Sequence, residues 1–271
     1  MTTWSPPGPA YLFCPADRPE RFAKAAAVAD VVIVDLEDGV APERRNEARE
    51  NVRNSTLDPA TTIIRVNPTS SPEHERDLAM LHDTSYTTLM LAKTSSADEV
   101  RSLNHFNVIA LCESAEGVVA LEDIAACRNV VGLMWGSEDL VASLGGYSSR
   151  HHDGSLRDVA RYARARTLIV ARARHLLALD AVLLNFEDLD ALALEAADAA
   201  AMGFTGTACV HPTQVGVVRA AYAPSEAQIS WARRVLEGTN GREGAVRVDG
   251  LMVDGPVLAQ ARQILSRVRE P

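Results

Sequence analysis

Eight times along the chain, a short apolar run is followed by a segment with a helical pattern. Most of the runs are continuously apolar rather than alternating, which is typical of parallel strands buried on both faces. The segments between them often start with Ser, Asp or Pro and end near Gly or Asn, as helices do. The runs cover residues 10–14, 31–37, 61–67, 87–93, 107–113, 129–135, 180–186 and 206–212.

Eight strand–helix units within about 220 residues predict an α/β fold of the (β/α)8 TIM-barrel type. A doubly wound sheet is the alternative, but the sequence has neither GxGxxG after the first strand nor a GxxxxGK[ST] loop. We predict a catalytic barrel over residues 1–222 and a C-terminal helical extension over residues 223–271. The extension combines a Gly-rich linker with a last helix and is too small to fold alone. It is therefore expected to pack on its own barrel or on a neighbouring subunit.

The composition narrows the class of protein. With 271 residues, 47% hydrophobic, the chain can bury a sizeable core, and a net charge of −9 argues against nucleic acid and anionic membranes as partners. No apolar run approaches the roughly 20 residues that span a bilayer, and the N-terminus is unlike a secretory signal. We expect a cytoplasmic protein with reduced cysteines, because no CxxC spacing occurs among Cys14, Cys112, Cys127 and Cys209.

In a TIM barrel, the functional residues lie at the C-terminal ends of the strands. Polar side chains are concentrated there in this sequence, and acids predominate among them. The candidates are Asp35, Glu37, Asp38, Arg65, Asn67, Lys93, Glu113, Glu138, Asp139, Asn185 and His211.

Two of these acids are predicted to form a metal site. Glu113 ends the fifth run and Asp139 follows the sixth, so neighbouring strands about 5 Å apart would bring them together. Two such carboxylates repel each other unless a cation lies between them, and Mg²⁺ suits a site of this kind. The alternative is that Glu138 and Asp139 only cap the following helix, and Glu116 is a rival ligand to Glu113.

Two basic residues face this acidic end. Arg65 follows two isoleucines, and a bidentate contact to a carboxylate is its best use, with a salt bridge to Glu37 or Asp38 as the alternative. Lys93 is suited to pair with a barrel acid. A Schiff-base role for Lys93 is disfavoured, because nearby carboxylates would keep it protonated.

An ordered set of short motifs runs through the chain: LFCPADRPERFAKA, DLEDGV, RVN, LAK, ALCESAEG, WGSEDL, CVHPTQ and MVDGP. In this set the sequence resembles the citrate lyase β-subunit-like (CitE-like) proteins of the HpcH/HpaI aldolase superfamily, which also holds malyl-CoA and citramalyl-CoA lyases. No single motif is specific, but their order is.

The resemblance implies a TIM barrel with Mg²⁺ held by Glu113 and Asp139 and a 2-oxo acid bound to that metal. Arg65 would hold a substrate carboxylate. The resemblance also implies a homotrimer in which the tail reaches a neighbouring subunit, where Asp254 acts as the catalytic base.

The implied reaction is cleavage of a 3-hydroxyacyl-CoA, of the citramalyl-CoA or malyl-CoA type, to acetyl-CoA and a 2-oxo acid such as pyruvate, oxaloacetate or glyoxylate. We expect Lys93 and the backbone N–H groups of Gly136 and Ser137 to face the substrate. Glu37 and Asp38 would orient Arg65 or metal-bound waters, and Glu138 would cap the helix or act in the same way.

Two other activities are compatible with the same residues. One is a thioesterase or malate-synthase-like activity, and the other is a citrate lyase β subunit acting on an acyl-carrier-protein thioester. Arg233, Arg234 and Arg242 in the tail are placed to meet CoA phosphates, or else lie on solvated helix faces.

Overall fold

A computed structural model describes residues 4–239 and 245–268 of the protein. The chain divides into two compact units, Met1–Val218 and Arg219–Pro271. This division falls inside helix α10 (Pro212–Tyr222), whereas the sequence places the boundary after residue 222.

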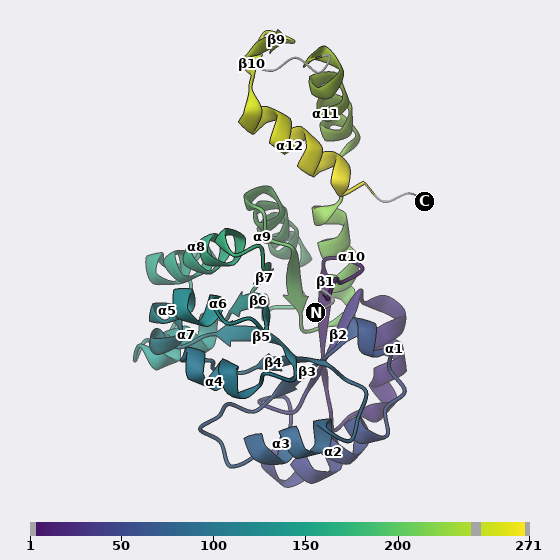
Figure 1. The fold of residues 1–271 in the computed structure, drawn as a ribbon, viewed down its shortest axis with the longest axis vertical. Helices are drawn as coiled ribbons and strands as arrows, with labels where there is room; N and C mark the ends of the chain where they lie inside the picture. The colour runs from purple at the N-terminus through teal and green to yellow at the C-terminus, as the bar shows by residue number, and fades with distance from the viewer. Residues whose placement is uncertain (1–3, 240–244, 269–271) are drawn as a thin grey trace. The chain divides into compact units, whose positions relative to one another are not determined.

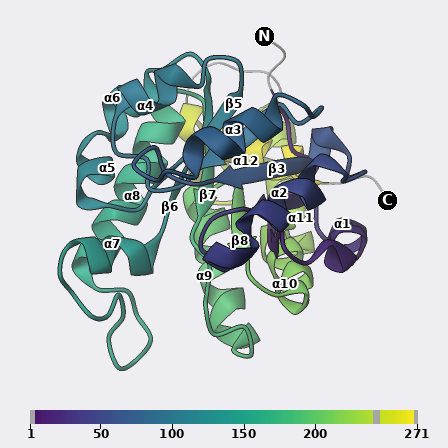
Figure 2. The ribbon, with the colours of Figure 1, turned by 90° about the horizontal axis from the view of Figure 1, so that it is seen from below.

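Eight parallel strands close into a barrel in the order of the sequence, with β1 paired to both β2 and β8. The predicted TIM barrel is confirmed, and the strands lie at the centre of the first unit with helices around them (Figures 1 and 2). The strands are β1 (Ala10–Pro15), β2 (Val31–Asp35), β3 (Thr62–Val66), β4 (Thr88–Leu91), β5 (Asn107–Cys112), β6 (Val130–Trp135), β7 (Leu177–Asp180) and β8 (Gly206–Cys209).

Helices follow the strands and cover the outside of the barrel. Two short helices replace the single one expected between β5 and β6. Among the described residues, no helix is both long and apolar enough to cross a membrane. The described helices of this unit, besides the first part of α10, are α1 (Phe22–Val28), α2 (Arg45–Arg53), α3 (His74–Leu81), α4 (Ala97–Ser102), α5 (Ala115–Val119), α6 (Leu121–Ala125), α7 (Ser137–Ser143), α8 (Asp158–Ala173) and α9 (Leu189–Met202), with 3₁₀ turns at Pro19–Arg21, Pro42–Arg44 and Pro59–Thr61.

One apolar cluster draws a side chain from every strand of the barrel. Alternate residues of a barrel strand face the interior, and the cluster follows that period of two. On three strands the next inward-facing position, at the C-terminal end, is polar: Asp35, Arg65 and Glu113 each stand two positions after a cluster member. Because of this period, these three side chains share one mouth of the barrel. The cluster consists of Tyr11, Val31, Ile33, Ile63, Met90, Ile109, Leu111, Met134, Leu179 and Ala208.

The seventh strand differs from the prediction. The sequence predicts residues 180–186, but β7 is Leu177–Asp180. Helix α8 ends at Ala173, and His175 then adopts a left-handed φ of 57° that reverses the chain into the strand. Apolar residues flank Asp180 on both sides, so the apolar pattern alone did not locate the strand. Asn185, predicted at the strand end, lies in the following loop.

The second unit has a small core of its own. Helices α11 (Glu226–Thr239) and α12 (Gly255–Ser266) pack through Ala232, Val235 and Ala261. Between them, β9 (Val246–Val248) and β10 (Leu251–Val253) pair antiparallel, where a linker was predicted. The Asp249–Gly250 turn has φ angles of 50° and 83°, as expected of a tight Asp-Gly hairpin turn.

Candidate active site

Arg65 and Asp35 form a buried, bidentate ion pair at the site. They are partners in the β2–β3 register, so each stands at the C-terminal end of its strand. Arg65 Nε lies 2.7 Å from Asp35 Oδ1, and Nη2 lies 2.7 Å from Oδ2. Its guanidinium also lies 4.9 Å from the centre of the Phe13 ring. Burial lowers the pKa of Arg65, but the charge and hydrogen bonds of Asp35 outweigh it, so the residue stays cationic.

Asp35 also shapes the loop that follows it. Its Oδ1 accepts a hydrogen bond from the backbone N–H of Glu37 at 2.9 Å, and its Oδ2 accepts one from Gly39 at 2.8 Å. The sequence placed Asp35 among the candidates but assigned it no role. An acid ending one strand in register with an arginine ending the next was the available signal.

Glu37 and Lys93 extend the ion-pair network. Arg65 Nη1 lies 3.1 Å from Glu37 Oε2, so the expected alternative salt bridge to Glu37 is present beside that to Asp35. Lys93 Nζ contacts Glu37 Oε1, and it lies 3.0 Å from Asp38 Oδ2 and 3.6 Å from Asp139 Oδ1. Burial lowers the pKa of Lys93, but hydrogen bonds to Glu37 and Asp38 outweigh it and raise the pKa. A protonated ammonium agrees with the expectation that Lys93 forms no Schiff base.

Glu113 is the buried acid of the site, with only 4% of its surface exposed. Burial and then the negative charge of Asp139 raise its pKa to about 8. The backbone N–H of Lys93 donates to Glu113 Oε1 at 3.2 Å, and Lys93 adopts a left-handed φ of 50° there. A Cβ added to Gly136 would lie 2.5 Å from Glu113 Oε2. Glycine at this position therefore makes room for the carboxylate.

Asp139 and Glu138 share the first turn of α7 but have different surroundings. The side chain of Asp139 is 39% exposed, and its charge acts on Glu113. Glu138 Oε1 accepts hydrogen bonds from Ser137 Oγ at 3.1 Å and from Ser149 Oγ at 2.5 Å. Gly136 occupies the N-cap position of α7, so Glu138 does not serve as the cap.

The charges of the mouth fit a divalent cation. Five acids against two bases leave an excess of negative charge that repels an anionic substrate. A cation between Glu113 and Asp139 would relieve the repulsion that raises the Glu113 pKa. Within residues 4–239 and 245–268, no group of three or more His, Cys, Asp or Glu side chains surrounds one metal position, so the described residues would supply two carboxylates. The charged residues are Asp35, Glu37, Asp38, Arg65, Lys93, Glu113 and Asp139.

Other predicted residues belong to later parts of the chain. His211 stacks on Phe186 with ring centres 4.8 Å apart. Asp254 precedes α12 in the second unit, and Arg234 pairs with Asp249 there at 2.8 Å. Arg242 lies outside the described residues.

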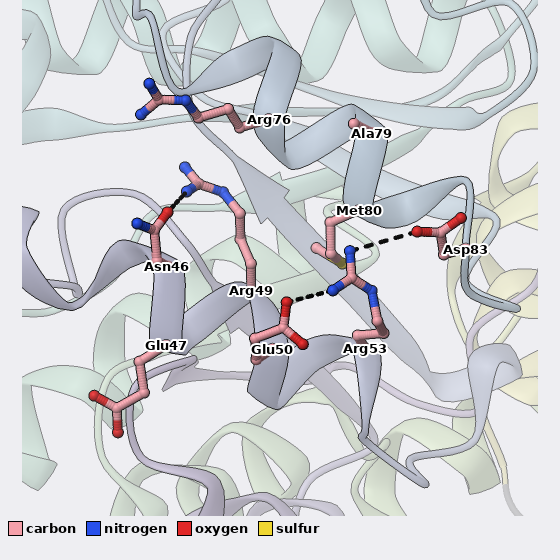
Figure 3. A pocket seen from close by; sticks show the side chains of 9 residues that line it. All are labelled: Asn46, Glu47, Arg49, Glu50, Arg53, Arg76, Ala79, Met80 and Asp83. Atoms are coloured by element: carbon pink, nitrogen blue, oxygen red, sulfur yellow. Dashed lines mark hydrogen bonds and ion pairs between the residues drawn. The ribbon is translucent and has the colours of Figure 1, made fainter.

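A polar hollow between α2 and α3 is separate from the mouth (Figure 3). Arg49, Arg53 and Arg76 contribute to its lining, and each already pairs with an acid. The hollow therefore offers no excess charge for a ligand.

The chain is similar to proteins named as a citrate lyase subunit beta-like protein, a citramalyl-CoA lyase and a malyl-CoA thioesterase. It is 53% identical over 263 residues to a citrate lyase subunit beta-like protein of Mycobacterium tuberculosis, which covers 97% of this chain and 96% of the relative. It is 31% identical to human mitochondrial citramalyl-CoA lyase, covering 96% of this chain and 85% of that one. It is 30% identical to a (3S)-malyl-CoA thioesterase of Cereibacter sphaeroides, covering 94% and 93%.

A solved structure is similar over nearly the whole chain. The crystal structure of CitE from M. tuberculosis with magnesium, acetoacetate and coenzyme A superimposes with a TM-score of 0.93 at 53% identity, covering 96% of this chain and 97% of that chain. The family model for HpcH/HpaI aldolase/citrate lyase matches residues 10–212. The resemblance drawn from the motifs is confirmed, and the chain belongs to the HpcH/HpaI aldolase/citrate lyase family.

Proposed function

We propose that this protein is a Mg²⁺-dependent carbon–carbon lyase. Its substrate would be a 3-hydroxyacyl-CoA of the citramalyl-CoA or malyl-CoA type, and its products acetyl-CoA and a 2-oxo acid. The observation that carries the proposal is that two carboxylates, Glu113 and Asp139, are close enough to repel each other at the barrel mouth, where Arg65 also lies. The relatives named citramalyl-CoA lyase and the CitE complex with magnesium and coenzyme A support it.

Glu113 and Asp139 would hold the Mg²⁺. Bound there, the ion supplies Lewis-acid polarisation of the oxygen that becomes the ketone of the 2-oxo acid. Gly136 keeps the space that the Glu113 carboxylate needs, and the Lys93 N–H orients one of its oxygens.

Arg65 would bind the substrate carboxylate. Asp35 and Glu37 hold the guanidinium in place, so its fork does not need to be ordered when substrate binds. Lys93 would add a second positive charge on the same side of the site. Gly136 and Ser137 would present their backbone N–H groups to the oxo acid.

Cleavage requires a base at the 3-hydroxyl group. The base takes the hydroxyl proton, the C–O bond becomes a carbonyl, and the C2–C3 bond breaks with its electrons passing to the thioester enolate. Protonation of that enolate at carbon gives acetyl-CoA. We assign the base to Asp254 of a second copy of the chain, within a cytoplasmic homotrimer.

The experiment is an assay of purified 3-hydroxyacyl-CoA esters with Mg²⁺ and with a chelator. We expect acetyl-CoA and one 2-oxo acid in equal amounts, and loss of turnover with the chelator. Pyruvate, oxaloacetate and glyoxylate identify the acyl group that was cleaved. Formation of neither product from any ester would contradict the proposal.

A second candidate is a thioesterase, favoured by the relative named (3S)-malyl-CoA thioesterase. Water would then release free CoA and a 3-hydroxy acid, with or without a malate-synthase-like condensation beforehand. Chromatography of the same reactions separates the 3-hydroxy acid from the oxo acid. If turnover appears only with an acyl-carrier-protein thioester, the chain acts as a citrate lyase β subunit.

A further inference from the structure

Asn67 follows β3 and is 2% exposed, yet no step of the proposed reaction uses it. Its side-chain Nδ2 donates to the backbone oxygen of Leu36 at 2.9 Å and to Asp77 Oδ2 at 2.7 Å. Leu36 stands between Asp35 and Glu37, the two acids that hold Arg65. Asn67 is therefore hydrogen-bonded to the backbone of the loop that contains Glu37, which pairs with Arg65 and Lys93.

Asp77 of α3 accepts hydrogen bonds from both the side chain and the backbone of Asn67. Asp77 has 0% exposure, and its Oδ2 also accepts the backbone N–H of Asn67 at 3.0 Å. Arg49 of α2 donates from Nε to Asp77 Oδ1 at 2.7 Å, and His74 Nδ1 lies 2.8 Å from the Asn67 backbone oxygen. A buried carboxylate is costly unless it is paired and hydrogen-bonded, and this one is both.

Arg49 connects this network to the outer helices. It is anchored by Asn46 at 2.9 Å and by Glu73, and Figure 3 shows its side chain with its bond to Asn46. Two side chains of α3, Asp77 and His74, therefore contact Asn67 directly, and Arg49 of α2 holds Asp77. The Asn67 amide also donates to the backbone oxygen of Leu36. The chain of contacts leads from the outside of the barrel to the mouth.

We propose that Asn67 is a positioning residue for the active site. Through the Leu36 carbonyl, it holds the loop that places Glu37 against Arg65 and Lys93. Asp77 and Arg49 fix Asn67 for this purpose. The inference rests on the proposed function for its kinetic consequences but not for its structural ones.

Asn129 offers a matched control. It is also buried, and its Nδ2 donates to two backbone oxygens, those of Val100 at 2.8 Å and Leu103 at 3.0 Å. It precedes β6, so it stands at the N-terminal end of the barrel, opposite the mouth. Asn129→Ala therefore removes two amide hydrogen bonds from the same fold without touching the Leu36 loop.

The first measurement is hydrogen–deuterium exchange of residues 36–40 in the full-length protein. The backbone N–H groups of Glu37 and Gly39 are bonded to Asp35 and report on this loop. Asn67→Ala is expected to speed exchange there by about tenfold or more, whereas Asn129→Ala leaves it within about twofold of the wild type. Equal exchange in the two variants would overturn the proposal, whatever reaction the protein catalyses.

The second measurement is a double-mutant cycle with Glu37→Gln under lyase assay. Asn67→Ala is expected to lower kcat/KM by about tenfold to a hundredfold in the wild type but by less than about twofold in Glu37→Gln. Multiplicative losses would show that Asn67 does not act through Glu37. If Asn67→Ala does not fold, Asn67→Ser, which keeps a polar group but lacks the second donor, takes its place in both measurements.

The two measurements separate the two hypotheses. If the wild type shows no lyase activity but Asn67→Ala loosens residues 36–40, the proposed reaction is wrong and the positioning contact stands. If lyase activity is present and both the exchange and the kinetics of Asn67→Ala match those of Asn129→Ala, the positioning role is wrong.

Discussion

Asp35 holds Arg65 through two hydrogen bonds of 2.7 Å, one to Nε and one to Nη2. Nη1 also lies 3.1 Å from Glu37 Oε2, so two acids anchor the guanidinium. Arg65 is thus held in place before substrate arrives, and its geometry matters as much as its charge.

Arg65→Lys is predicted to keep the positive charge but lose the bidentate contact of the guanidinium to Asp35. Because an ammonium cannot replace two directed contacts, we expect kcat/KM to fall by about a hundredfold, mostly through KM. Arg150→Lys serves as the control, since Arg150 also forks onto an acid, Glu195 of α9. Steady-state kinetics check this, and equal losses in the two variants would remove the special role of Arg65.

Glu113 is predicted to make the metal-free protein less stable as the pH rises. Burial and the charge of Asp139 raise its pKa from an ordinary 4.5 to about 8. Between these values the folded protein binds more protons than the unfolded chain, so the free energy of unfolding falls with pH across this window. Glu113→Gln lacks this loss and should be more stable than the wild type by about 2–4 kcal/mol at pH 8.5, with little difference near pH 4.5.

Denaturant titrations in the presence of a chelator, from pH 4.5 to 8.5, measure this difference. Glu116→Gln is the control, because Glu116 is exposed in the same segment. A gap between Glu113→Gln and the wild type that does not change with pH would contradict the burial of a titrating carboxyl group.

Gly136→Ala is predicted to weaken Mg²⁺ binding. The added Cβ would lie 2.5 Å from Glu113 Oε2, so the carboxylate must move. We expect the dissociation constant for Mg²⁺ to rise by about tenfold or more while the fold is retained, since metal sites tolerate little displacement of a ligand. Gly216→Ala is the control, because a Cβ there meets no described atom within 4 Å. Calorimetric titration with Mg²⁺ compares the two, and unchanged affinity in Gly136→Ala would exclude Glu113 as a ligand.

Two inactive variants are predicted to restore each other's activity. If Asp254 completes the site of a neighbouring copy, then Glu113→Gln and Asp254→Asn each disable every site of a pure oligomer. Co-expression would rebuild intact sites, about a quarter of the total for random assembly of a ring. Recovery of lyase activity in the mixture is the measurement. Full activity of Asp254→Asn alone would remove it as the base, and no recovery would show that it serves its own chain.

The apolar runs alone were enough to predict the barrel, because parallel strands buried on both faces leave a period that survives in the sequence. They also placed Glu113 next to Asp139, since consecutive βα units are neighbours in a barrel. The seventh strand was misplaced because apolar residues flank Asp180 on both sides, and a left-handed turn at His175 decided where α8 stops.

The sequence by itself determined that Asp35, Arg65 and Glu113 reach the mouth of the barrel, but only the tertiary structure decided which side chains hold each other. Asp35, rather than Asp38, takes the fork of Arg65, because the β2–β3 register sets those two residues side by side. With Lys93 in a left-handed conformation, its backbone N–H donates to Glu113, and Asn67 after β3 donates to Leu36 after the neighbouring strand β2. These contacts depend on strand register and on backbone angles, and the periodicity of apolar residues in the sequence specifies neither.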